Sequence, residues 1–527
     1  MNKSVHSRMI LLLLAAVLLF CTACQSVASP PVTTTTTAAT TATADRPPMY
    51  DPDTQTEPVQ VTYAPGTQGG NIRGEAVQTL TPEKSVTSSV VADAHLGFRF
   101  LCWSDGSTDP VRFGDSFAVD TTVVAYFEID SLNLPAISIT TGVSPDEITR
   151  EEYVDGMFSI SGNSLSASDT LTDSALQIRG RGHGSWTYQK KGWKLKLSTA
   201  RSLLGLGEGK STEWVLIANQ VDRSLLRNAA ATWIQNQVDL IWVSEYAFVD
   251  LYFNGEYMGV YQLYEQVEAD EHKVHVPTST PEDVSYFAEL SVHAEEPMVR
   301  CMRHLYEIHS DLPEENSDEY LAAISAHLLA CHQAVESGDY EAVNALIDIA
   351  SVVDAYIVEE LVKNLDSGWD SFYLHRYAGG KLTFGPLWDF DMSSGNVKAD
   401  KTSPCHLSFQ EPEGLYAGNT AAGGDRQQNQ WFQLFMKCDW FVELVKIRWQ
   451  ELSPKMAELP DLLLRTGNTY KTAFERNFMK WNILTKRLTT EADVILTLDS
   501  YDKQLKYLAD WYRDRIAWLD EVWGEEE

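Results

Sequence analysis

Basic residues are scarce in this sequence: 41 Lys and Arg stand against 74 Asp and Glu, a formal charge of −33. This balance disfavours a mainly electrostatic partnership with nucleic acid, so we expect no nucleic-acid partner, although a local basic strip can bind phosphate. Cysteine is also rare, and beyond residue 24 no C-x-x-C pair occurs, which argues against a disulfide framework or a zinc site. With only 20 Pro but 44% hydrophobic residues in 527, the chain predicts large folded cores in more than one domain.

The first residues lack the length of a membrane span but have the pattern of an export signal. Lys3 and Arg8 precede a short apolar run over residues 9–21. Cys24 then follows Thr22 and Ala23, as in a bacterial lipoprotein signal that is cleaved before a lipidated cysteine. We expect a signal peptide over residues 1–23 and a lipid anchor at Cys24 on the outer face of the cytoplasmic membrane. Simple secretion is the lesser alternative.

The rest of the chain divides by composition. Residues 24–58 are rich in Thr, Ala and Pro and predict a tether. Short alternating segments over residues 59–130 predict a small all-β module that resembles the β-repeat modules of bacterial surface proteins. Strand periodicity continues over residues 134–270, whereas residues 316–365 and 428–522 show helical periodicity, including an apolar helix over 343–364 and another over 501–523. We therefore expect an α+β fold with a main domain over residues 134–520.

A glycine-rich turn carries the strongest cationic signal. Arg179 and Arg181 alternate with glycines before a strand that holds Lys191, Lys194 and Lys196. Glycines let backbone N–H groups approach a ligand closely, and arginine forks suit phosphate. In the strand, Lys194 and Lys196 point to the face opposite Trp193, Leu195 and Leu197. A plain β-hairpin with a solvated lysine face explains this pattern about equally well.

A set of carboxylates is the most informative feature. Asp366 follows the predicted apolar helix, and a hairpin with a Gly379-Gly380 turn leads to Asp389 and Asp391. Because a hairpin returns the chain to its start, Asp366 and Asp389 should lie near the same end. Converging carboxylates suit Mg²⁺ or Mn²⁺, which prefer hard oxygen ligands. Capping of turns by aspartate is the structural alternative.

Together these segments resemble the CotH family, atypical relatives of the protein kinases. The resemblance covers about residues 134–520. The matching segments are, in chain order, 179–182 with Trp186 and 190–191, 214–219 with Asp222 and 227–228, 254–261 with Glu265, 364–366, and 385–391 with 395–396. It implies a two-lobed kinase-like domain that uses ATP with Mg²⁺ or Mn²⁺ to phosphorylate Ser or Thr of secreted, surface or spore-coat proteins.

The resemblance also implies roles for single residues. Asp366 would be the catalytic carboxylate, and Asp389 a metal ligand with Asp391 a weaker second one. One of Lys191, Lys194 and Lys196 would neutralise phosphate, paired with Glu265. Arg227 is either a phosphate clamp or the partner of Asp222 in a structural ion pair.

Three positions depart from the pattern. His183 stands where relatives commonly carry Asn, His309 where many carry Lys, and Ser371 where a protein kinase has its metal-binding Asn. A competing hypothesis follows from these three changes and from the expected export to a place where ATP is scarce. The chain could be a non-catalytic surface scaffold, or a carbohydrate-binding adhesion protein, with a kinase-like fold.

Overall fold

A computed structural model describes residues 48–162, 170–367, 370–398, 410–418 and 430–524. The expected signal peptide, Cys24 and most of the tether therefore lie outside the described residues. Within the described part of the chain, no helix is long and apolar enough to cross a membrane. Four cysteines in this part, Cys102, Cys301, Cys331 and Cys438, are free thiols.

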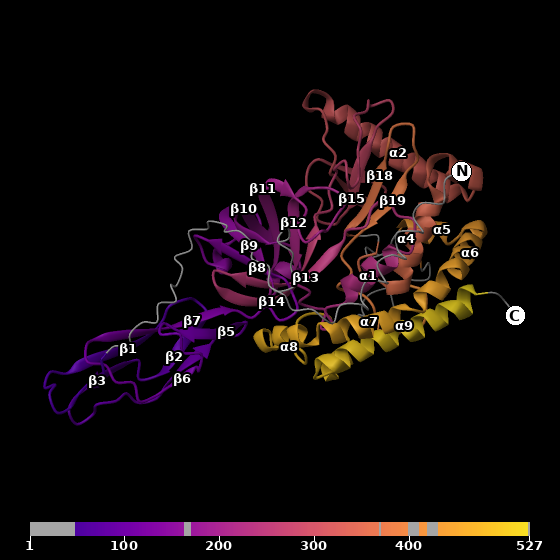
Figure 1. Ribbon diagram of the computed structural model, residues 1–527. Helices are drawn as coiled ribbons and strands as arrows, with labels where there is room; N and C mark the ends of the chain where they lie inside the picture. Colours follow the sequence, from indigo (N-terminus) through magenta and orange to yellow (C-terminus); the bar gives the residue numbers. More distant parts are fainter. Residues whose placement is uncertain (1–47, 163–169, 368–369, 399–409, 419–429, 525–527) are drawn as a thin grey trace, which may run out of the picture.

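The first folded unit is a small β module that projects from one end of the molecule (Figure 1). Alternation in its strands places Val59, Val61 and Tyr63 in a core with Trp103 and Phe127. Its strands form a four-stranded sheet, order β3-β1-β7-β5, and a three-stranded sheet, order β2-β4-β6. Their bounds are β1 Val59–Pro65, β2 Gly70–Gly74, β3 Val77–Leu80, β4 Val90–Ala94, β5 Phe98–Trp103, β6 Val111–Arg112 and β7 Thr121–Ile129.

A closed barrel follows, with strand order β10-β11-β12-β14-β13-β8-β9. The expected alternation in β11 is confirmed: Trp193, Leu195 and Leu197 are buried inside the barrel, whereas Lys194 is partly exposed and Lys196 exposed. Helix α1 (Arg227–Gln235) lies between β12 and β13 in the chain. The strands are β8 Ala136–Thr141, β9 Val154–Ser161, β10 Leu171–Arg181, β11 Gly192–Arg201, β12 Ser211–Ile217, β13 Tyr246–Phe253 and β14 Glu256–Glu265.

Beside the barrel stands a five-stranded sheet, order β16-β17-β15-β18-β19. Barrel residues Val215 and Tyr264 share an apolar cluster with Phe287, Tyr373 and Trp388 of this second layer. The outer face of the barrel thus packs against the sheet. A functional site can form in the space beside that contact. The strands are β15 Tyr286–Leu290, β16 Met298–Cys301, β17 His304–Ile308, β18 Phe372–Arg376 and β19 Thr383–Leu387.

Helices dominate the C-terminal part and pack on the sheet and on one another (Figure 1). They are α2 Ser317–Ser337, α3 Tyr340–Leu346, α4 Ile349–Val362, α5 Gln430–Phe435, α6 Asp439–Met456, α7 Leu459–Thr469, α8 Lys471–Lys480 and α9 Tyr501–Trp523. The expected mixed α+β fold, with strands first and helices later, is confirmed. The helix predicted over residues 501–523 is confirmed as α9.

One expected helix is wrong in its bounds. Residues 343–364 do not form a single helix, because α3 ends at Leu346 and α4 begins at Ile349. Ile347 is extended, and the Asp348 side chain accepts a hydrogen bond from the Ser351 N–H as the N-cap of α4. A capping aspartate starts a new helix although the apolar periodicity continues across it.

Candidate active site

The β18–β19 hairpin brings the acidic segments together. Leu365 N–H donates to Met392 O at 3.0 Å, and Ser394 N–H donates to Val362 O at 2.7 Å. These two bonds tie the turn after α4 to the segment after β19. Asp366 is on the turn after α4, and Asp391 is on the segment after β19. The two aspartates therefore lie at the same end of the hairpin, as the sequence predicts.

The carboxylates at this end of the hairpin are buried and repel one another. Burial raises the pKa of Asp391 well above its usual value, and the charges of Asp389, Asp366 and Asp222 raise it further. Burial also raises the pKa of Asp389. Uncompensated negative charge of this kind is what a bound cation would relieve.

Two further acids belong to the cluster and were not predicted. The charges of Asp370 and Glu289 add to the raised pKa of Asp389. Asp370 Oδ1 accepts a hydrogen bond from Ser291 Oγ at 2.6 Å, which joins the turn before β18 to the end of β15. Glu289 comes from β15, opposite Tyr373 in the register with β18. In the sequence, the only sign that Asp370 belongs to the cluster was its position four residues after Asp366. Nothing in the sequence pointed to Glu289.

Arg181 is the cation of the acidic cluster. Its positive charge opposes the raised pKa of both Asp389 and Asp391. The guanidinium lies 5.3 Å from the centre of the Trp388 ring, and within the described residues it makes no hydrogen bond or ion pair of 4.0 Å or less. Its donors thus remain available to an anion at the edge of the acidic cluster.

The glycine-rich turn between β10 and β11 is built closely around its aromatic residue. A Cβ at Gly180 would lie 2.2 Å from the Trp186 ring, so a larger residue does not fit there. Lys191 Nζ sits over the same ring, 4.6 Å from its centre. At the tip, the His183 ring stacks on His293, with centroids 4.2 Å apart. The turn is therefore held against the loop that follows β15.

The remaining cations lie on the outer face of the barrel. Lys194 Nζ is 3.2 Å and Lys196 Nζ 3.9 Å from the carboxylate of Glu213 on β12. Arg179 donates to Arg150 O at 2.6 Å and covers the Tyr153 ring at 5.1 Å. Arg179 and Arg181 share one face of β10 by alternation, so this cationic face leads toward the acidic cluster.

The expected pairing of a strand lysine with Glu265 is wrong. Leu195 is opposite Trp214, and Trp214 is opposite Glu265, so these three residues share the inner side of the barrel. Lys194 and Lys196 point outward and meet Glu213 instead. Glu265 is buried near Gly207, and burial raises its pKa.

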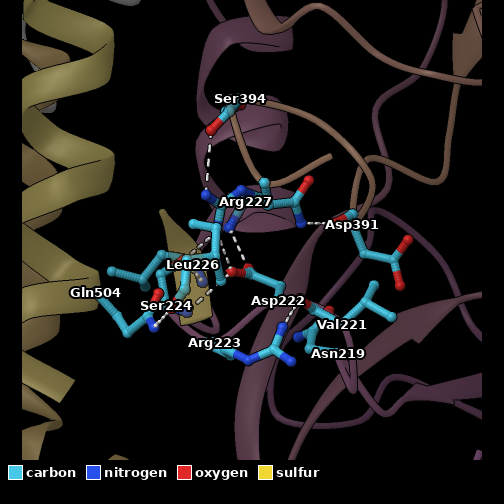
Figure 2. A network of polar contacts seen from close by, with 12 residues as sticks. Asn219, Val221, Asp222, Arg223, Ser224, Leu226, Arg227, Asp391, Ser394 and Gln504 are labelled. Carbon is cyan, nitrogen blue, oxygen red and sulfur yellow. Dashed lines mark hydrogen bonds and ion pairs between the residues drawn. The ribbon is translucent and has the colours of Figure 1, made fainter. Parts of the chain in front are cut away.

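Arg227 fits the structural alternative rather than the phosphate clamp. Its side chain is 1% exposed and pairs with the fully buried Asp222 at 2.5 Å. Figure 2 shows this pair beside Asp391. The Arg227 guanidinium also donates to Ser393 O at 2.9 Å and Ser394 O at 3.1 Å. A guanidinium so paired and buried is not exposed to a phosphate ligand, but it positions the segment that follows Asp391.

Two of the departures from the pattern lie next to the acidic cluster. His309 Nε2 lies 2.9 Å from Glu289 Oε2, so the imidazole stands against an acid of the cluster. Ser371 adopts a left-handed backbone with φ 51° just before β18. Asp370, one residue earlier, supplies the carboxylate that acts on Asp389.

The donor set is compatible with a divalent cation held jointly with a ligand. Among the residues that the structure describes, no group of three His, Cys, Asp or Glu side chains is arranged to hold a metal ion alone. Mg²⁺ is usually held by one or two carboxylates, with phosphate oxygens and water completing its shell. Asp389 and Asp391, with raised pKa values and hard oxygens, fit that lesser requirement.

Comparison with known protein families finds a match over most of the main domain. The family described as CotH kinase protein matches residues 178–519, from the glycine-rich turn to the last helix. No curated protein matches the chain significantly. Because the match spans more than half of the sequence, the chain belongs to the CotH kinase protein family.

Proposed function

We propose that this protein is a protein kinase that transfers the γ-phosphoryl group of ATP to Ser or Thr hydroxyls of secreted, surface or spore-coat proteins. The main support is the juxtaposition of Arg181, an unpaired guanidinium within the described residues, with the cluster of Asp366, Asp389 and Asp391. A kinase needs cationic donors for phosphate beside carboxylates that hold a metal and orient the acceptor. The two-lobed kinase-like architecture is part of the same proposal.

Each residue has a chemical task in this proposal. Asp389 and Asp391 would hold Mg²⁺ or Mn²⁺, which when bound neutralises the phosphate charge. Asp366 would accept the proton of the attacking hydroxyl. The hydroxyl oxygen then bonds to the γ-phosphorus, and the bond between that phosphorus and the ADP oxygen breaks. Arg181 would donate to phosphate oxygens.

The strand cations fall into two groups. Lys194 is the best placed of the three lysines for a kinase-type ion pair, with Glu213 taking the place foreseen for Glu265. Lys191 lies on the Trp186 ring, and Lys196 is the more exposed of the two lysines beside Glu213. Both lie farther out than Lys194. Arg179 would support the cationic face without contacting the reacting phosphate.

Phosphotransfer is tested directly with the full-length chain, radiolabelled ATP and Mn²⁺, using casein and the protein itself as acceptors. We expect wild type to label one of them, and Asp366→Asn or Asp389→Asn to reduce the rate by about a thousandfold. Asp93→Asn, an exposed change in the β module, is the matched control and should keep full activity. Equal labelling by wild type and both site variants would reject the catalytic proposal.

A scaffold is the second candidate, because the signal peptide expected over residues 1–23 would place the chain where ATP is scarce. In that case the lipid anchor and the β module would present the domain to envelope proteins or polysaccharide. Calorimetric titration separates the two functions. Saturable heat with Mg-ATP supports the kinase, whereas heat with glycans and none with nucleotide supports the scaffold.

A further inference from the structure

A groove of about 720 Å³ lies beside the glycine-rich turn, outside the acidic cluster. Its walls include Tyr188 from the turn, Gln220 from the segment after β12, and Lys480, Trp481, Lys486 and Arg487 from the end of α8 and the following loop. This volume is within the usual range of ligand sites. The groove is therefore large enough for part of a polymer chain.

The charged residues that line this groove have the opposite sign to the net charge of the chain. Among the described residues that line it are three cations and no carboxylate, although the chain carries 74 acidic residues. Lys480 pairs with Glu256, and Arg487 pairs with Asp493. The ammonium of Lys486 makes no ion pair within the described part of the chain and is exposed. A cation without a partner in a strongly acidic protein favours an acidic ligand.

The groove also offers groups suited to a peptide backbone. Gln220 is 3% exposed, and its Oε1 has no hydrogen-bond partner among the described residues. Such an acceptor needs an N–H or O–H donor, which a peptide provides and a polyphosphate at neutral pH does not. Trp481, fixed by its Nε1–H donating to Met258 O at 2.8 Å, adds apolar surface.

The walls are rigid and adjoin the proposed active site. Arg223, 1% exposed, donates to Ile483 O at 3.0 Å and Lys486 O at 2.5 Å, and pairs with Glu491 at 3.0 Å. Figure 2 shows Arg223 on the segment that also carries Asp222, next to Asp391. Tyr188 lines the groove and lies within electrostatic reach of Asp391. One wall of the groove, at Tyr188, thus lies near the acidic cluster.

We propose that this groove binds an extended acidic peptide segment next to the hydroxyl that accepts the phosphoryl group, an inference that rests on the proposed function. Lys486 would contact an acidic side chain of the segment. Gln220 would accept from a backbone N–H, and Trp481 would pack on an aliphatic stem. Selection of acceptors with acidic flanks follows from this arrangement.

The test is fluorescence anisotropy with the full-length chain, in the absence of nucleotide. The probes are three labelled peptides with one serine flanked by glutamate, by glutamine or by lysine. We expect the glutamate peptide to bind most tightly, and Lys486→Glu to weaken that binding by about tenfold. Lys446→Glu, on α6 and away from the groove, is the matched control and should bind as wild type.

Other outcomes would overturn the inference. No binding, equal binding of the three peptides, or an unchanged Lys486→Glu variant would each reject the groove as an acidic-peptide site. Inorganic polyphosphate that competes as strongly as the glutamate peptide would assign the groove to anionic polymers instead. Peptide binding is measured without nucleotide and phosphotransfer with it, so a failure of phosphotransfer and a failure of the groove can be told apart.

Discussion

Two adjacent glutamates at the end of α4 differ in their partners, and Glu359 should make the stability of the protein depend on pH. Glu360 is fully buried and pairs with the fully buried Arg515 at 2.7 Å. Glu359 is 2% exposed, and its Oε2 has no hydrogen-bond partner among the described residues. Burial raises the pKa of Glu359 from 4.5 to about 8, with the charge of Asp366 contributing to the rise. Glu359 is therefore neutral in the folded protein at pH 7.

The magnitude follows from proton linkage. Between 4.5 and about 8 the folded chain keeps the Glu359 proton that the unfolded chain has lost, so the free energy of unfolding falls as pH rises. At 1.36 kcal/mol for each pH unit this loss reaches about 5 kcal/mol. A glutamine resembles the neutral acid in shape but cannot ionise. Relative to wild type, Glu359→Gln should thus be of similar stability near pH 5 and about 5 kcal/mol more stable above about pH 8.

Urea unfolding of the full-length chain, followed by tryptophan fluorescence across this pH range, measures the difference between wild type and variant. Glu360→Gln is the contrasting variant. It leaves Arg515 buried without its carboxylate and should lower the free energy of unfolding by about 3–5 kcal/mol throughout the same range. Identical pH dependence in wild type and Glu359→Gln would refute the assignment of a neutral acid behind Asp366.

Three further predictions concern the site. Arg181→Met should weaken Mg-ATP binding by about tenfold in calorimetry, because the Arg181 guanidinium has no ion pair within the described residues and its donors are open to phosphate; unchanged affinity would contradict its phosphate role. Mn²⁺ affinity, also from calorimetry, should increase as pH rises beyond the usual titration range of carboxyl groups, because the raised pKa values of Asp389 and Asp391 make proton loss a condition of binding; a profile that is flat above that range would contradict this. Asp222→Asn should lower the free energy of unfolding by about 3–5 kcal/mol in urea, since Arg227 stays buried; a loss below about 1 kcal/mol would show that the pair is unimportant.

Local patterns predicted much of this fold. The periodicity of α9 and the alternation of β11 follow directly from side-chain spacing. The Gly379-Gly380 turn predicted a hairpin that brings Asp366 and Asp389 to one end. These features depend on short stretches of chain, which is why sequence reasoning reached them.

Contacts between distant strands were out of reach. Glu213 replaced Glu265 as the lysine partner because the registers of β11, β12 and β14 decide which side chains share a face. Glu289 joins the acidic cluster only because β15 pairs with β18. The burial of Arg227 and the break at Asp348 likewise depend on packing and capping that apolar periodicity does not encode.

The most direct measurement is the anomalous diffraction of Mn²⁺ in a crystal soaked with a non-hydrolysable ATP analogue. We expect one manganese peak about 2.1 Å from a carboxylate oxygen of Asp389, with phosphate oxygens completing its shell. The Arg181 guanidinium should contact the same phosphates. A nucleotide bound elsewhere, or a manganese ion without Asp389 as a ligand, would contradict phosphotransfer at this site.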